Sequence, residues 1–123
     1  MLFRSDAKSS WSKKTFPKTV KKATNSTYEW QVKTYLYMLQ GMTGDDSWRH
    51  GEVFHCLVDT PEELVPEYED DSLHFSSNLV YNIRVTVVPI ELTEDDKKHM
   101  ERRIKLALKY AVQYKQFLLN KNK

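Results

Sequence analysis

The chain has 123 residues, of which 40% are hydrophobic, with a formal net charge of +2. This size predicts a single domain over residues 1–123, and the one cysteine excludes an internal disulfide and a cysteine-based zinc site. The mean hydropathy of −0.66 and the absence of a signal peptide or an apolar run of membrane-spanning length predict a soluble, cytoplasmic protein without a membrane partner.

A short strand is predicted for residues 1–8, and it carries Asp6 and Lys8. Residues i and i+2 of a strand point to the same side, so the carboxylate and the ammonium lie together. A carboxylate can help to hold Mg²⁺, and a lysine can orient or activate a water and stabilise charge on a phosphate. The pair therefore suits phosphodiester hydrolysis, although a surface ion pair has the same sequence.

Residues 9–25 are predicted to form a long loop with an ordered patch around Trp11 and Phe16, because they carry Ser, Thr, Lys and Pro17 without a helical stripe. The loop is basic, since acids are absent between Asp6 and Glu29. Lysines and an aromatic side chain can hold phosphates and stack on a base. The candidate nucleic-acid-binding residues are Trp11, Lys13, Lys14, Lys18, Lys21 and Lys22. A merely solvated lysine loop explains the same residues.

The next segment opens with a capping box, Ser26 to Glu29, and predicts a helix that ends at the stop signals Gly41 and Gly44. Gln31 and Tyr35 are four residues apart, so they share one face of this helix. Both can reach toward the same phosphate or metal-bound water. The alternative is that Tyr35 belongs to the core and Gln31 to its boundary.

Residues 52–58 form an apolar run that predicts a buried strand, in which His55 is interpreted as a hydrogen-bonded core histidine. A short helix is predicted to begin within residues 59–63. The acids that follow fit no metal-binding loop, so we interpret them as a solvated loop; they are Glu67, Glu69, Asp70 and Asp71.

Two elements are predicted for the last third of the chain. Residues 79–91 predict a strand near a sheet edge, with one face formed by Tyr81, Ile83, Val85 and Val87. Residues from Thr93 onward predict a long, capped helix. Its apolar stripe consists of Met100, Ile104, Ala107, Leu108, Ala111 and Leu118.

Three segments together, DAKSSWS, YEWQVKTYLYMLQGMTG and EVFHCLVDTPEELV, resemble the back half of the PD-(D/E)XK nuclease superfamily, particularly its phage and RecB-like exonuclease branch. The resemblance covers residues 3–119. It implies an α+β, restriction-endonuclease-like core that is truncated at its N-terminus and has a long C-terminal helix. It also implies a bacterial or phage-infected host cell.

The resemblance implies a Mg²⁺- or Mn²⁺-dependent DNA nuclease. It also implies that Asp6 is a metal ligand and Lys8 the catalytic lysine. Gln31 and Tyr35 would then form the helical motif that supports the active site and contacts the DNA backbone. Members of this family carry a further aspartate on the preceding strand, which has no counterpart before Asp6. A site with one carboxylate is weak, so the chain is expected to be inactive or weakly active alone.

Three hypotheses follow. The chain is the C-terminal part of a nuclease that is completed by upstream sequence or a partner; an inert nucleic-acid-binding module on the same scaffold; or a phage structural or interaction protein. An uncovered edge at the N-terminal strand would expose unpaired backbone groups, which proteins seldom leave open. We therefore expect a homodimer or a partner chain on that edge.

Overall fold

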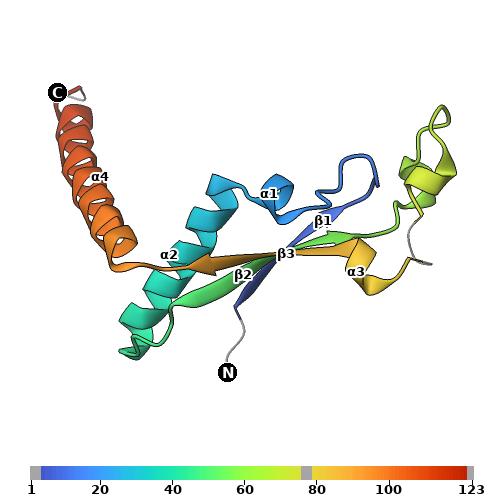
Figure 1. Ribbon diagram of the computed structural model, residues 1–123. Coiled ribbons are helices and arrows are strands. Elements are labelled where there is room, and N and C mark those ends of the chain that lie inside the picture. The colour runs from blue at the N-terminus through green and yellow to red at the C-terminus, as the bar shows by residue number, and fades with distance from the viewer. Residues whose placement is uncertain (1–3, 76–78, 122–123) are drawn as a thin grey trace. The chain divides into compact units, whose positions relative to one another are not determined.

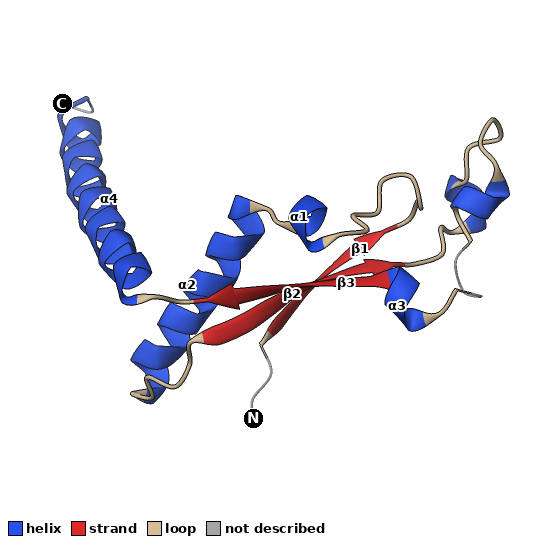
Figure 2. Ribbon diagram, viewed as in Figure 1, coloured by secondary structure: helices blue, strands red, loops and turns tan. Residues whose placement is uncertain are grey.

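The computed structural model describes residues 4–75 and 79–121. They fall into two compact units, Met1–Glu91 and Leu92–Lys123. The first unit is a mixed α+β structure built on a three-stranded sheet, and the second is a helix (Figures 1 and 2). The predicted α+β class is thereby confirmed, whereas the assignment of one domain to residues 1–123 stays a prediction.

The sheet has the order β1-β2-β3. Its strands are β1 (Ser5–Ser10), β2 (His50–Leu57) and β3 (Val85–Glu91). β1 is parallel to β2, and β2 is antiparallel to β3. A parallel pair needs a crossover connection, which α2 (Ser26–Thr43) supplies, and a short helix α1 (Val20–Ala23) precedes it.

The core lies where α2 packs against one face of the sheet. Val32 and Leu36 of α2 are buried, as are Val53 of β2 and Val88 of β3, which are opposite each other in the register. Gly51 of β2 allows α2 to approach the sheet closely, because a Cβ added there would lie 2.7 Å from Val32 Cγ1. Apolar side chains at helical spacing thus meet side chains that alternate along the strands.

The ends of α2 differ in part from the prediction. Its N-cap is Asn25, whose side chain accepts hydrogen bonds from the amides of Thr27 and Tyr28, so Ser26 is the first helical residue and not the cap. Gly41 lies inside the helix, and the helix ends at Gly44 in the left-handed region, at φ 69°. Only Gly44 acts as the predicted stop, because a glycine adopts that conformation without steric cost.

The strands are shifted from their predicted ranges by a few residues. β1 runs to Ser10 instead of ending at residue 8, and residues 1–3 of the predicted strand lie outside the described residues. β2 starts at His50. After it come two short 3₁₀ helices, η1 (Glu62–Leu64) and η2 (Asp71–Leu73), of which η1 corresponds to the predicted short helix.

The predicted strand over residues 79–91 is wrong in its first half. Tyr81–Arg84 form a helical turn, α3, and only Val85–Glu91 form β3. Tyr81 and Ile83 lie in this turn, so they do not share a strand face with Val85 and Val87 as predicted. The buried face of β3 is Thr86, Val88 and Ile90, because this face packs in the core, where Val88 lies opposite the buried Val53 of β2.

The second unit contains α4 (Glu94–Lys121). The predicted cap is confirmed, because the Asp96 amide donates to Thr93 Oγ1 and the Asp96 carboxylate accepts from the Thr93 amide. Within this unit the helix has no second described element to cover its apolar stripe, and Ile104, Leu108 and Leu118 are exposed. Across residues 4–75 and 79–121, no helix combines the length and apolarity that crossing a membrane requires.

Candidate active site

β1 presents alternate side chains to α2, and these include Asp6 and Lys8. Their side chains retain 20% and 25% of their full exposure, and Asp6 Oδ2 lies 2.8 Å from Lys8 Nζ. The predicted common orientation of the two residues is therefore present, and the pair is half-buried rather than a freely solvated surface pair. A half-buried ion pair is less screened than an exposed one.

Lys8 also reaches across to α2. Its ammonium donates a hydrogen bond to Gln31 Oε1 at 3.2 Å, and the Gln31 amide in turn donates to the Tyr35 hydroxyl at 2.8 Å. Gln31 and Tyr35 are one helical turn apart, which lets the amide and the phenol meet. The four residues Asp6, Lys8, Gln31 and Tyr35 thus form one connected polar chain from the strand to the helix.

The electrostatics of Lys8 follow from these neighbours. The hydrogen-bonding contact with the Asp6 carboxylate raises the pKa of Lys8, while burial acts in the opposite direction. The ring of Tyr28 adds a further contact, with Lys8 Nζ 4.4 Å from the ring centroid. The side chain is thereby held as an ammonium between a carboxylate, an amide oxygen and an aromatic face.

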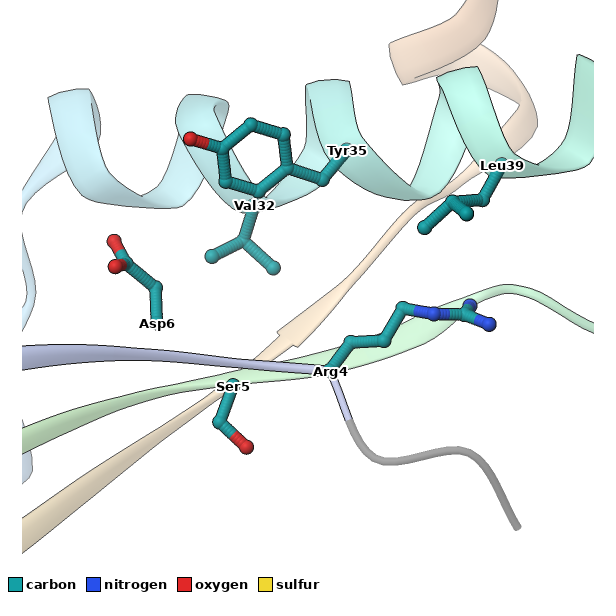
Figure 3. A pocket seen from close by; sticks show the side chains of 6 residues that line it. All are labelled: Arg4, Ser5, Asp6, Val32, Tyr35 and Leu39. Atoms are coloured by element: carbon teal, nitrogen blue, oxygen red, sulfur yellow. The ribbon is translucent and has the colours of Figure 1, made fainter. Parts of the chain in front are cut away.

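A cavity of about 290 Å³ opens beside this polar chain (Figure 3). Asp6 of β1 and Tyr35 of α2 line it, and the Asp6 carboxylate points up toward the helix on the side where the Tyr35 hydroxyl lies. Its other lining residues are Arg4, Ser5, Val32 and Leu39. Tyr35 is 47% exposed, so it lies at the rim of this cavity and not in the core.

Asp6 is the residue of this site that suits a metal. Its Oδ2 is shielded from water and faces the Lys8 ammonium. Carboxylate oxygens are the ligands that Mg²⁺ and Mn²⁺ prefer. However, residues 4–75 and 79–121 contain no group of three His, Cys, Asp or Glu side chains that could hold a metal ion. The described residues therefore fit a divalent metal only in part, with one carboxylate.

The basic segment is tied to the rest of the unit at several points. Phe16 is buried, as the predicted ordered patch requires. Thr86 of β3 donates a hydrogen bond to the Pro17 carbonyl, and Thr60 donates one to the Trp11 carbonyl. Lys13 donates to the Ser72 carbonyl at 2.5 Å, so this lysine contacts the acidic segment, which comprises residues 67–71 and the adjoining helix η2.

The other predicted nucleic-acid-binding residues lie at the surface. Lys21 and Lys22 are on α1, and Lys14 and Lys18 are in the loop before it. All four are exposed, and Trp11 is 48% exposed. They are accessible to a ligand, and their role remains a prediction.

The remaining candidates keep structural roles. His55 is buried as predicted, but its Nε2 makes no hydrogen bond within the described part of the chain. Glu69 of the acidic segment contacts His74 at 2.7 Å, and Asp70 caps η2 by accepting from the Ser72 amide. These acids therefore stabilise their own loop.

Tyr28 contacts Lys8 but was not predicted as a site residue from the sequence. It precedes Gln31 by three positions and Tyr35 by seven, so all three lie on one face of α2. This spacing was the available signal, because residues at i, i+3 and i+7 of a helix form a continuous stripe.

The comparisons with known proteins agree with this fold. No protein-family model and no curated protein matches the sequence. Among solved structures, the chain is similar to a phage-related exonuclease from Haemophilus somnus 129PT, with a TM-score of 0.58 and 22% sequence identity over 89% of this chain. The match covers 48% of the exonuclease, so the chain spans about half of its length. The chain thus shares its α+β fold with part of that exonuclease.

Proposed function

We propose that the chain is the catalytic-lysine-bearing part of a metal-dependent nuclease that hydrolyses phosphodiester bonds in DNA. The observation that carries this proposal is the connected chain of Asp6, Lys8, Gln31 and Tyr35 beside a cavity. The structural similarity to a phage-related exonuclease supports it, as does the resemblance of the motifs to the PD-(D/E)XK superfamily.

Each residue has a defined task in this proposal. Asp6 holds Mg²⁺ or Mn²⁺, which when bound offsets negative charge on the phosphate. The Lys8 ammonium stabilises the additional charge of the transition state, because a fixed cation in a partly dry site acts without reorganising. Gln31 and Tyr35 hold Lys8 in place and present an amide and a phenol to the DNA backbone.

A complete site needs oxygen ligands beyond Asp6. Mg²⁺ is commonly held by one or two carboxylates together with substrate phosphates and water. We therefore propose that a second acid comes from a longer form of this chain or from a partner. The exonuclease match, which spans half of that protein, supports a larger functional unit.

The partner is proposed to cover β1. This strand forms one edge of the sheet within residues 4–75 and 79–121, and uncovered strand edges favour pairing with another chain. Size-exclusion chromatography with light scattering tests this proposal. A dimer or a hetero-complex is expected, and a stable monomer at micromolar concentration contradicts it.

The deciding experiment incubates linear duplex and single-stranded DNA with Mg²⁺ or Mn²⁺. It compares the wild type, a version extended upstream, Asp6→Asn and the control Glu67→Gln, which changes an exposed acid of the loop. Metal-dependent cleavage by the extended version is expected, and Asp6→Asn should abolish it whereas Glu67→Gln should retain it. Equal metal-dependent cleavage with and without Asp6→Asn contradicts the site.

A second candidate is an inert nucleic-acid-binding module, which the single carboxylate and the exposed lysines favour. It predicts binding that weakens steeply with salt, since lysines displace counterions from phosphates. Salt-sensitive binding without cleavage in any version, with or without metal, supports this alternative over the nuclease.

A further inference from the structure

We infer that Tyr28 is a positioning residue of the proposed nuclease site, which holds the Lys8 ammonium through the face of its ring. This inference rests on the proposed function and extends the helical motif to Tyr28, Gln31 and Tyr35. It is carried by the placement of Lys8 Nζ at 4.4 Å from the centroid of the Tyr28 ring.

The contact has the geometry of a cation–π interaction. An ammonium within about 6 Å of the ring centroid is attracted by the negative face of the ring, and the attraction grows when water is excluded. Lys8 retains 25% of its side-chain exposure, so it is partly desolvated. The ring therefore offers this ammonium a favourable contact in addition to the Asp6 carboxylate.

The position of Tyr28 is itself fixed from two sides. Its amide donates to the Asn25 side chain, which caps the helix. Its ring lies 6.0 Å from the His55 ring, centroid to centroid, with the planes tilted by 49°. His55 is the register partner of Lys8 across the β1–β2 pair. The ring of Tyr28 thus contacts both members of one cross-strand pair.

The three contacts of Lys8 differ in kind and therefore restrict its ammonium in different directions. Asp6 attracts it from the same strand at 2.8 Å, Gln31 accepts its hydrogen bond at 3.2 Å, and Tyr28 faces it with a π surface. A lysine side chain has four flexible carbons, and holding it in one geometry has an entropic cost. The attraction between the Tyr28 ring and the ammonium offsets part of that cost.

The first test is structural and requires no activity. A ring face shifts the NMR signals of protons above it, so the ε-methylene signal of Lys8, assigned by its loss in Lys8→Arg, is expected upfield of other lysines. The shift is expected to persist in Tyr28→Phe and to vanish in Tyr28→Leu. The control Trp30→Leu removes the ring that contacts Lys33 at 4.9 Å on the same helix and should leave the Lys8 signal unchanged.

The second test is kinetic and uses whichever form of the protein cleaves DNA. Tyr28→Leu is expected to lower kcat by about 3- to 30-fold, the range that a cation–π contact supplies, with little change in KM. Tyr28→Phe should restore most of the rate, and Trp30→Leu should retain it. A loss in Tyr28→Phe equal to that in Tyr28→Leu contradicts the inference, because the ring would then not be the active feature.

A series of variants at position 28 keeps the inference testable if Tyr28→Leu misfolds. Phenylalanine with increasing numbers of fluorine atoms keeps the shape of the ring and weakens its negative face. The Lys8 contact and the rate are expected to decline stepwise along this series, and a constant rate overturns the inference. If no form of the protein cleaves DNA, the proposed function fails, while the Lys8 signal still decides whether Tyr28 holds the ammonium.

Discussion

Lys8 on β1 donates a hydrogen bond to Gln31 on α2 at 3.2 Å, although the two residues are 23 positions apart in the sequence. This bond joins the strand that carries Asp6 to the helix that carries Tyr35. The arrangement predicts how the individual side chains contribute.

Gln31→Met should lower the rate of DNA cleavage about tenfold, because it removes both the acceptor for Lys8 and the donor to Tyr35 while keeping the volume similar. Tyr35→Phe removes only the hydroxyl that accepts the hydrogen bond from Gln31. It should lower the cleavage rate by a few-fold at most. Steady-state kinetics with fluorescent DNA measures both. A Gln31→Met enzyme as fast as the wild type would show that the hydrogen bonds from Lys8 through Gln31 to Tyr35 have no role in catalysis.

Lys8→Met should separate metal binding from chemistry. Removing a cation that lies 2.8 Å from the Asp6 carboxylate is expected to tighten Mn²⁺ binding by about tenfold, while cleavage falls by a factor of about 10²–10³. Calorimetry or paramagnetic relaxation measures the affinity. Lys14→Met, which alters an exposed lysine of the basic loop, should leave Mn²⁺ binding unchanged. Weaker Mn²⁺ binding by Lys8→Met would contradict the assignment of Asp6.

Gly51→Ala should destabilise the protein by about 1–3 kcal/mol, since its new methyl group would overlap Val32 at 2.7 Å and approach the Arg4 carbonyl at 3.2 Å. Gly41→Ala provides the matched comparison, because nothing lies within 4 Å of the added carbon and alanine favours a helix by about 0.5–1 kcal/mol. Urea unfolding should therefore shift in opposite directions for the two variants.

Thr60→Val should cost about 1–3 kcal/mol in the free energy of unfolding. The buried hydroxyl donates to the Trp11 carbonyl at 2.6 Å and contacts His74 Nδ1 at 3.0 Å, so valine leaves buried polar groups without it. Thr34→Val removes an exposed hydroxyl that bonds the Trp30 carbonyl and should change stability by less than about 0.5 kcal/mol. Equal losses in the two variants would contradict the role of Thr60.

Acid should loosen the turn at η2. Hydrogen bonds from Ser72 to its carboxylate lower the pKa of Asp70, and the nearby Lys13 adds to this effect. A lowered pKa in the folded state stabilises the fold above the unfolded pKa of about 3.9, and this contribution is lost as the pH falls through the folded value. The protection of the Leu73 and His74 amides from exchange, expressed relative to the intrinsic exchange rate at each pH, should therefore fall below pH 4. Asp70→Asn should remove the acid-dependent part of that fall.

The sequence alone predicted the α+β class, the helix between the basic loop and the second strand, and the closeness of Asp6 to Lys8 and of Gln31 to Tyr35. These features depend on local periodicity: two residues per repeat in a strand, and one turn every 3.6 residues in a helix. The cap of α4 at Thr93 was readable for the same reason, because its hydrogen bonds stay within four residues.

Tertiary structure decided the rest. Only the packing of α2 on β1 joins Lys8 to Gln31 and places Tyr28 over the Lys8 ammonium, because contacts between distant segments depend on crossing geometry that no local pattern encodes. The buried face of β3 was likewise set by packing, since Val88 lies opposite the buried Val53 of β2. Local spacing thus paired the polar residues within each element, and the long-range fold combined the two pairs into one candidate site.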